Sequence, residues 1–490
     1  MKSTSLLIFP VLFCFLINVS PAQSTFEYNS AKADTGQVVA DAVSLPSGSL
    51  IFVGQNTIEN KTYGIMIKLS PAGDLIGQRL FAWHGKNTYI EKIIQTGPDR
   101  LIVIGGVGQA SFSNLFVCAI DTALNETDSR EYSLAPHCYY ETNALIDHNN
   151  YIVVHGTVMD SAVSGNLLYP FLFKLSMDLD SIRSYFFNKS SFGIYDMIEK
   201  SDQTGYYLFE QPGFSTDSHG PAVLDLNYSF NIVKQDQVAA EVVSYNTARW
   251  ITDSTFIMSG EFSNNWGSKR SIGILVTDST FETLNLTHFG EDSIVNFPGF
   301  RRNLDFITPA EIYAGGTTKM GFASTYMEYD SWYFLNKFDS SLALTWQRRY
   351  GTPGYYYRLY GILATNDGGC VMYGTRYAYP TNSMTLDIAI LKVDRYGYAV
   401  SADEKLIIEP ESAIIYPNPG FDIITVHTAM KNTVFVLSDC SNREILRASL
   451  KSGRSSFYTG DIPPGLYIYR IMQSGNVIQT GKWIKDGKKE

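Results

Sequence analysis

The chain has 490 residues, of which 45% are hydrophobic, 18% charged and 14% aromatic, and its formal net charge is −10. This composition excludes a coiled coil and an intrinsically disordered chain, both of which need a larger charged fraction. The acidic balance and the lack of a basic run argue against nucleic acid as a partner, because nucleic-acid binding depends on clustered Lys and Arg. The 39 glycines are typical of many short strands joined by tight turns.

The first 22 residues have the pattern of a Sec signal peptide. Lys2 precedes an apolar run over residues 6–17, and small residues at 20–22 come before Gln23. The run is too short to span a bilayer and no later segment is apolar enough, so we expect a soluble mature chain that begins at Gln23. The signal peptide predicts the Sec translocon as the first partner of the chain. A lipid anchor at Cys14 is rejected because large residues flank it.

The mature chain keeps four cysteines: Cys118, Cys138, Cys370 and Cys440. An exported chain meets an oxidising compartment, so a Cys118–Cys138 disulfide is one interpretation. We favour isolated buried thiols, because no pair has the spacing of a redox or metal motif.

One pattern recurs along the body: a polar turn, then an apolar strand that ends in glycine. Three copies are PSGSLIFVG (residues 46–54), GPDRLIVIG (97–105) and HNNYIVVHG (148–156). Later copies end at Glu210, Gly260, Gly315 and Gly374, so only the fourth lacks the glycine. A second anchor recurs at Lys68, Ala119, Lys174, Asp225, Val276, Lys337 and Lys392. Both series indicate seven repeats at intervals of about 51 to 61 residues.

A repeat of this length suits a blade of four antiparallel strands. Stacking seven such sheets around an axis covers both faces of each sheet, which explains the continuous apolar strands. We therefore predict an all-β chain in which residues 23–402 form a seven-bladed β-propeller. The last copy, TNDGGCVMYG (365–374) preceded by WQRRYG (346–351), resembles propeller-like repeats of secreted bacterial proteins, and this resemblance concerns the fold alone.

Alignment of Gly54 with Gly374 places Phe26 opposite Trp346. Residues 25–29 then correspond to an outermost strand that has no sheet of its own. We predict that this strand pairs with the seventh blade and closes the ring. The alternative is a mature N-terminus without fixed structure.

Aromatic residues gather between the predicted strands of the sixth and seventh repeats. Flat rings with hydroxyl groups suit stacking on sugars and contacts with proteins. The alternative is that these rings, together with those of Tyr333 and Tyr357, pack between blades or cover the rim. The candidate ligand contacts are Tyr326, Tyr329, Trp332, Tyr355, Tyr356, Tyr377 and Tyr379.

A different set of motifs follows residue 402. In order they are YPNP (416–419), an alternating strand over 424–427, IPPGLYIYR (462–470) and KWIK (482–485). About seven short strands in residues 403–490 predict an immunoglobulin-like sandwich. The motifs resemble the C-terminal sorting domain of proteins exported by the type IX secretion system of certain Gram-negative bacteria. The alternative is an ordinary sandwich with no role in sorting.

The resemblance implies three consequences for export. The outer-membrane translocon of the type IX system would recognise the module, a sorting peptidase would remove it, and the body would be attached to lipopolysaccharide or released. Asn442 replaces the glycine usual in the family, and residues 487–490 extend beyond its usual end. The residues that carry the resemblance are Tyr416, Pro417, Asn418, Pro419, Gly465, Tyr467, Lys482 and Lys485.

Triplets of Asp, Ser or Thr and an apolar residue recur in the body. They resemble the O-glycosylation acceptor used on exported proteins in bacteria with this secretion system. The alternative is ordinary turn chemistry, which favours the same residue types. The candidate acceptors are Thr122, Ser161, Ser181, Ser254, Ser279 and Ser293.

No hydrolase, zinc-protease, phosphate-loop or dinucleotide motif occurs, and the seven histidines lack ligand spacing. The sequence therefore indicates no catalytic residue, no metal and no cofactor. We expect a monomeric, non-enzymatic module at the cell surface or in the medium that binds glycan or protein. The rival hypothesis is a glycoside hydrolase or polysaccharide lyase. Paired carboxylates about 5–10 Å apart near the axis would favour the enzyme, and a channel lined by apolar and hydroxyl groups would favour binding.

Overall fold

The computed structural model describes residues 24–30, 35–109, 112–133, 137–160, 167–187, 194–210, 222–237, 244, 246–262, 271–290, 295–320, 327–379, 385–399, 413–416, 418, 420–428, 430–451, 453–473 and 475–487. These residues form nine antiparallel sheets and one short 3-10 turn, η1 (Trp83–Gly85), so the all-β prediction is confirmed. The predicted signal peptide lies outside the described residues. Within those ranges, no helix has the length and hydropathy that a bilayer span requires.

Three sheets come first in the body. Their strands are β2 (Thr35–Ser44), β3 (Leu50–Ile58), β4 (Lys61–Leu69) and β5 (Leu75–Phe81); β6 (Thr88–Gly97), β7 (Arg100–Gln109), β8 (Phe112–Ile120) and β9 (Glu126–Tyr132); and β10 (His137–Ile146), β11 (Ile152–Asp160), β12 (Leu167–Leu175) and β13 (Ser181–Phe186).

The next sheets follow the same order. They contain β14 (Ile194–Glu199), β15 (Gly205–Glu210), β16 (Ala222–Asn227) and β17 (Ile232–Gln237); β18 (Thr247–Trp250), β19 (Thr255–Phe262), β20 (Ser271–Asp278) and β21 (Thr283–Phe289); β22 (Asn296–Pro298), β23 (Leu304–Phe306), β24 (Ile312–Thr318), β25 (Trp332–Phe338) and β26 (Leu344–Tyr350); and β27 (Tyr355–Ala364), β28 (Cys370–Ala378) and β29 (Asp387–Val393) with β1 (Phe26–Ser30).

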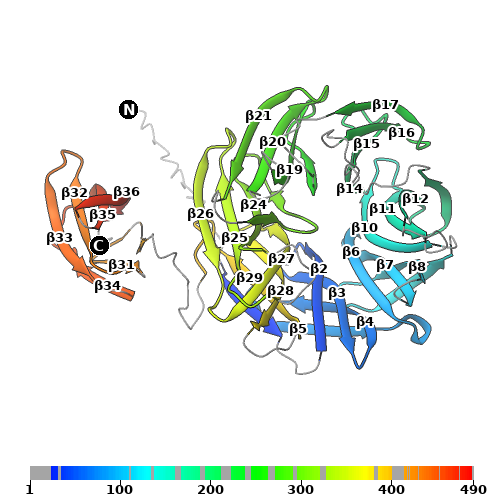
Figure 1. The fold of residues 1–490 in the computed structure, drawn as a ribbon, viewed down its shortest axis with the longest axis horizontal. Helices are drawn as coiled ribbons and strands as arrows, with labels where there is room; N and C mark the ends of the chain where they lie inside the picture. Colours follow the sequence, from blue (N-terminus) through cyan, green and yellow to red (C-terminus); the bar gives the residue numbers. More distant parts are fainter. Residues whose placement is uncertain are drawn as a thin grey trace, which may run out of the picture.

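These sheets lie around a central axis, with their first strands innermost (Figure 1). Each sheet packs on both neighbours, as the β2–β5 sheet illustrates. Ile51 and Val53 face the next sheet, where they join a buried cluster with Val103. Leu50 and Phe52 point the other way and join a cluster with Ile390 of β29. The continuous apolar strands are therefore explained by burial on both faces.

The ring is closed by the first strand of the described chain. β1 pairs antiparallel with β29, and Phe26 lies opposite Lys392. Phe26 is buried, and the Lys392 ammonium donates a hydrogen bond to the Ser24 hydroxyl at 2.9 Å. The predicted closure by the N-terminal strand is confirmed, shifted by one residue along the chain.

Removal of this strand should lower stability. A mature chain that starts at Gly36 exposes the edge of β29 and loses the burial of Phe26, so its unfolding free energy should fall by about 3 kcal/mol or more. Thermal unfolding beside the chain that starts at Gln23 measures the effect. An unchanged melting temperature would contradict closure by β1.

The repeated glycines lie inside the strands and not at their ends, which corrects the expectation from sequence. Gly54 is in the middle of β3, opposite a bulge in β2 where Val39 pairs with Gly54 and Asp41 with Val53. A Cβ atom at Gly54 would come within 1.9 Å of the Val38 carbonyl oxygen. Gly105 meets the same obstacle at 1.8 Å from the oxygen of Tyr89. The glycine is thus required by the close approach of the bulged first strand.

Substitution of this glycine should be costly. Gly54→Ala forces its methyl group against backbone and should destabilise the chain by about 2 kcal/mol or more. Gly36→Ala is the matched control on β2, because its Cβ would meet only the Thr57 Cβ at 4.0 Å. Equal melting temperatures for the two variants would contradict the role of the bulge.

The structure gives a role to the second anchor position of the repeat in two copies where it is lysine. The Lys68 ammonium donates to the carbonyl of Thr122, in the last turn of the next sheet, at 2.7 Å. Lys337 makes the equivalent bond to Arg395 at 3.1 Å. These two lysines therefore hydrogen-bond one sheet to the next in the outer part of the ring.

Residues 413–487 contribute the remaining two sheets among the described residues. One contains β30 (Ala413–Tyr416), β31 (Ile423–Thr428) and β34 (Gly453–Tyr458), and the other β32 (Thr433–Asp439), β33 (Glu444–Leu450), β35 (Gly465–Gln473) and β36 (Asn476–Lys485). Both sheets supply one core around Trp483 and Phe435. Tyr467 and Ile471 are buried while Leu466 is exposed, so the two faces of β35 differ in burial.

Two smaller predictions are also decided. Asn442 adopts a left-handed φ of 63°, as expected for a residue in the place of glycine. Cys118 and Cys370 are free and buried, and Cys440 is free and exposed. A Cys118–Cys138 disulfide is therefore wrong, since the Cys118 thiol lies in the core between sheets. The Cys138 side chain lies outside the described set.

Candidate functional site

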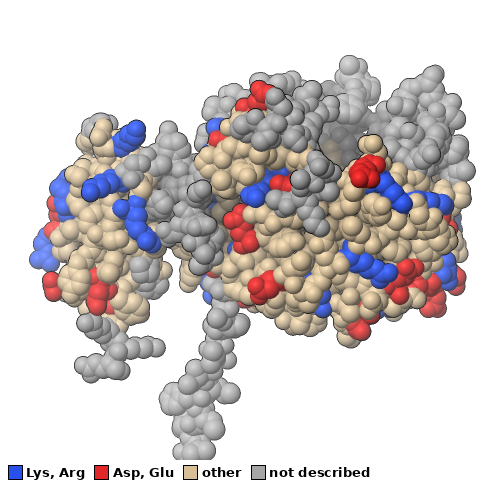
Figure 2. Space-filling view, turned by 90° about the horizontal axis from the view of Figure 1, so that it is seen from below, with Lys and Arg blue, Asp and Glu red and all other residues tan. Residues whose placement is uncertain are grey.

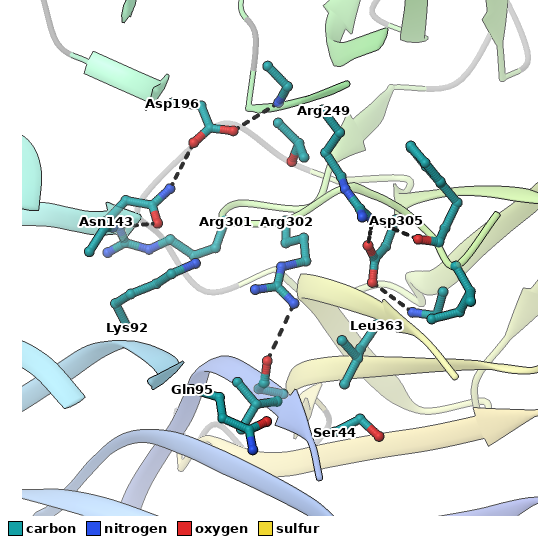
Figure 3. Close-up of a pocket in the computed structure, with 18 of the residues that line it drawn as sticks. Ser44, Lys92, Gln95, Asn143, Asp196, Arg249, Arg301, Arg302, Asp305 and Leu363 are labelled. Carbon is teal, nitrogen blue, oxygen red and sulfur yellow. Dashed lines mark hydrogen bonds and ion pairs between the residues drawn. The ribbon is translucent and has the colours of Figure 1, made fainter. Parts of the chain in front are cut away.

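A cavity of about 470 Å³ lies on the axis, lined by the first strands of the sheets (Figure 3). The bulges determine which side chains turn toward the axis, and of the four named next Lys92, Asn143 and Asp196 line the cavity. Asp41, Lys92, Asn143 and Asp196 are the first paired residues after the bulges of β2, β6, β10 and β14. Each repeat therefore brings an equivalent position to the same place, although the residue type differs.

The sequence contained a signal for these residues that the repeat comparison missed. Asp41, Lys92 and Asn143 each stand 13 residues before the repeat glycine. A polar residue at that offset, inside an otherwise apolar strand, marks the axial position.

Carboxylates in the channel accept hydrogen bonds from main-chain N–H groups of the next sheet. Asp41 accepts from Ile93 at 3.2 Å, and Glu91 from Thr142 at 2.6 Å. The same relation repeats farther round the ring, where Asp196 accepts from Ala248 at 2.8 Å and Asp305 from Ala364 at 2.9 Å. The innermost strand is a sheet edge, so its outward N–H groups have no strand partner and need these acceptors.

Four cations accompany the carboxylates. The Lys92 ammonium lies 3.2 Å and an Arg302 nitrogen 3.3 Å from the two oxygens of Asp41. Arg301 lies 3.1 Å from Glu91, and Arg249 pairs with Asp305. Figure 3 shows the Arg302 and Arg249 side chains among the residues that line the cavity.

An insertion brings two of these arginines to the axis. β22 and β23 both pair with β24, and residues 299–303 stand between them. The inserted segment bonds to β27, where the N–H of Arg301 donates to Tyr360 and the N–H of Ile362 donates to Arg302, both at 2.8 Å. The Pro298-Gly299 pair in the middle of a first strand is the sequence signal for this break.

The electrostatics of the buried groups differ from one carboxylate to the next. Burial would raise the pKa of Asp41, but Arg302 and Lys92 outweigh it and the pKa is lowered. The ion pair that the structure gives Asp196, with His155, is longer, at 4.0 Å. Burial raises the pKa of Asp196 to about 6, although the hydrogen bond from the Ala248 N–H acts in the opposite direction. Burial lowers the pKa of His155 to about 3, helped by Lys92, so this imidazole is neutral. Asp196 is therefore the axial group that titrates near neutral pH.

The aromatic residues selected from sequence lie elsewhere. Tyr356 and Tyr377 are buried and stack at 5.2 Å between β27 and β28. Tyr329 is 41% exposed and packs edge-on against Tyr356 at 5.8 Å. Trp332 lies under the Lys319 ammonium at 4.7 Å, and Tyr355 under Arg376 at 4.6 Å. Tyr379 is partly buried, and Tyr326 lies outside the described residues.

None of these described aromatics lines the axial cavity. Tyr333 and Tyr357 are buried as well. Packing between strands therefore accounts for the interior rings, and ligand binding by the seven selected residues stays a prediction.

Of the described glycosylation candidates, Thr122, Ser254 and Ser279 lie on turns or bends, and Ser181 begins β13. Ser181, Ser254 and Ser279 are exposed, whereas the Thr122 hydroxyl is bonded to the Asp99 carboxylate. Ser161 and Ser293 lie outside the part of the chain that the structure describes. Modification of these residues stays a prediction.

The sorting motifs come together at one edge of the C-terminal sheets. The Asn418 side chain donates to the Lys482 carbonyl and accepts from the Ile484 N–H, both at 2.8 Å, so it pairs with β36 as a strand would. Tyr416 accepts a hydrogen bond from Arg454 at 3.0 Å. Pro417 and Pro419 lie outside the described set.

The other motif residues support the same edge. The Tyr467 hydroxyl donates to the Pro463 carbonyl at 2.7 Å, and its ring lies 5.9 Å from that of Trp483. Gly465 begins β35. Lys482 is exposed, but Lys485 is buried and its ammonium donates to the Phe421 carbonyl. Lys485 therefore contributes to the packing of the domain, whereas the Lys482 side chain faces solvent.

Residues 414–486 match the family described as the secretion system C-terminal sorting domain. The tail is a type IX sorting domain. It directs secretion to the cell surface or the extracellular space and implies interaction with the type IX machinery. A search of curated proteins finds no match to the chain.

Three solved structures illustrate what the chain is similar to. The polysaccharide lyase Uly1 is 10% identical with a TM-score of 0.42, covering 75% of this chain and 91% of its own. An α-L-arabinanase of Penicillium chrysogenum with arabinobiose is 9% identical with a TM-score of 0.39, covering 76% and 98%. PorZ, a surface component of the type IX system of Porphyromonas gingivalis, is 9% identical with a TM-score of 0.25, covering 92% and 81%. Likenesses this distant carry no argument about activity.

The two motif lysines should separate by experiment. Lys485→Met removes a buried ammonium that donates to the Phe421 carbonyl and lies 3.4 Å from the Asp422 carboxylate, so it should destabilise the sorting domain by about 1 to 3 kcal/mol. Lys482→Met changes an exposed side chain and should alter stability by no more than about 0.5 kcal/mol. The rate of proteolytic cleavage within residues 413–487 reports both effects. Equal cleavage rates would contradict the structural role of Lys485.

Proposed function

We propose that the chain is an exported, seven-bladed β-propeller that binds glycan or protein without catalysing a reaction. In this proposal residues 1–22 are the Sec signal peptide, residues 23–402 the monomeric propeller, and residues 403–490 an immunoglobulin-like sorting domain. The type IX translocon recognises the tail, and a sorting peptidase removes it before the body is released or anchored at the outer surface.

The binding part of this proposal is supported by how the axial carboxylates are used. Asp41, Glu91 and Asp305 each accept a main-chain N–H and contact a cation, so they are committed to holding adjacent sheets together. A general acid or base needs its oxygens available to the substrate. The described lining combines apolar, hydroxyl and amide groups with paired charges, so it only partly matches the channel expected for binding.

One observation favours the enzymatic alternative. Asp196 lines the cavity with a pKa raised by burial to about 6, which suits a general acid in a glycoside hydrolase or polysaccharide lyase. Its oxygens also accept from Asn143 at 3.1 Å and from the N–H of Met197 at 2.9 Å, which is the pattern of a structural carboxylate.

Glycan-array binding of the mature chain, run beside a hydrolase and lyase screen, tests the two hypotheses. We expect retention on a subset of glycans and no product. Product formation that is lost in Asp196→Asn would establish the enzyme instead. Failure of both assays would leave protein ligands as the remaining class and would contradict glycan binding.

Deletion of residues 411–490 tests sorting. The truncated protein should stay inside the outer membrane, because the translocon would have no domain to recognise. Quantitative immunodetection of cell-surface, medium and periplasmic fractions measures this, with the full-length parent chain as the control for expression. Undiminished arrival outside the cell would refute the proposal.

A further inference from the structure

We propose that the axial cavity binds the anionic group of an acidic saccharide, either a uronate carboxylate or a sugar sulfate. The inference rests on the proposed glycan-binding function and specifies the class of glycan. The groups that would hold the anion are Lys92, Arg249, Arg301 and Arg302.

The first argument concerns which charges face the cavity. All four cations line it, whereas Asp41 and Glu91 do not. One oxygen of each of these two carboxylates accepts a main-chain N–H of the neighbouring sheet, and the other lies beside Arg302 or Arg301. A ligand in the cavity therefore meets four cations and only two carboxylates, Asp196 and Asp305, in a chain whose net charge is −10.

Figure 2 gives the contrast with the exterior. On the face in view, the described Lys and Arg residues are interspersed with Asp and Glu and most of the surface is uncharged. The cations of the cavity are gathered within one concave site, where low solvent access strengthens their attraction for an anion. Arg249 is the most accessible of them, with 37% of its side chain exposed.

The second argument concerns protonation. The four cations balance Asp41, Glu91, Asp305 and Asp196 when all are ionised, and protonation of Asp196 leaves one positive charge in excess. Lys92, Arg302, Asn143 and His155 are the groups that face Asp196. Burial raises the pKa of Asp196 to about 6. The affinity for an anion should therefore rise as the pH falls through this value.

The third argument favours a saccharide over an acidic peptide. A volume of about 470 Å³ falls within the ordinary size range of small-ligand sites. Ser44, Gln95 and Asn366 supply hydroxyl and amide groups to the lining, which suit sugar hydroxyls. The first strands use their edge N–H groups in bonds to the preceding sheets, so they cannot receive a peptide as an added strand.

Isothermal titration of the full mature chain tests the proposal. The probes are a galacturonic acid trisaccharide, the same trisaccharide with its carboxyl groups reduced, a sulfated galactose disaccharide, and hexaglutamate. At pH 5.5 we expect an acidic sugar to bind at least about tenfold more tightly than the reduced trisaccharide, as loss of a charge-assisted hydrogen bond predicts. The stronger of the two acidic sugars identifies carboxylate or sulfate as the source of the anion.

Variants locate the site. Arg249→Gln should weaken binding of the acidic sugar at least about tenfold. Arg130→Gln is the matched control, because Arg130 pairs with Asp128 on the outer strand β9. In the parent chain, affinity should fall between pH 5.5 and 7.5, and this change should be absent in Asp196→Asn. Should Arg249→Gln fail to fold, the salt dependence of the parent chain still decides, since ion pairing weakens with added salt.

Five results would overturn the inference. Equal affinities for the acidic and the reduced trisaccharide would be consistent with glycan binding but would show that the anionic group does not contribute to it. Full affinity in a folded Arg249→Gln chain would place the site elsewhere. Tighter binding of hexaglutamate would assign the cavity to an acidic peptide. An affinity that does not change with added salt would exclude ion pairing. If no probe binds, the proposed anion site is excluded, and the glycan array alone then tests the proposed glycan-binding function.

Discussion

The unpaired N–H groups of the innermost strands are the constraint on which the body depends. In every sheet the first strand has a partner on one side only, so its other edge would present bare donors to the channel. The chain supplies acceptors from the preceding sheet, as in the bond from Ile93 to Asp41 and the bond from Ala248 to Asp196. A hydrogen bond at the axis thus joins neighbouring sheets, in addition to their apolar contacts and the lysine bonds farther out.

The bulge and the glycine are parts of the same arrangement. The bulge in β2 inserts one residue ahead of Asp41, and the carboxylate then reaches the next sheet. The Val38 carbonyl is pushed toward β3 by that bulge, and only glycine at position 54 leaves room for it. Selection for the axial hydrogen bond therefore accounts for a glycine on a different strand.

This use of carboxylates also shapes what the cavity can do. Asp41 and Glu91 hold adjacent sheets together and do not line the cavity, while their cationic partners line it. The positive lining follows from the way the ring is held together. The sorting domain shows the same principle on a smaller scale, since Asn418 pairs with the backbone of β36 and the buried Lys485 holds the Phe421 carbonyl.

The sequence alone determined the all-β class, the repeats, the closing strand and the nature of the tail, because these depend on local periodicity, turn chemistry and motif order. It did not place the axial site. Asp41, Lys92 and Asp196 are more than 50 residues apart from one another, and only closure of the ring brings them together. The selected tyrosines do not lead to the cavity, since Tyr356 and Tyr377 are buried elsewhere, and a sequence pattern cannot distinguish such an interior position from the rim. Likewise, Lys482 and Lys485 look equivalent in sequence, and only the packing of β36 buries one and exposes the other.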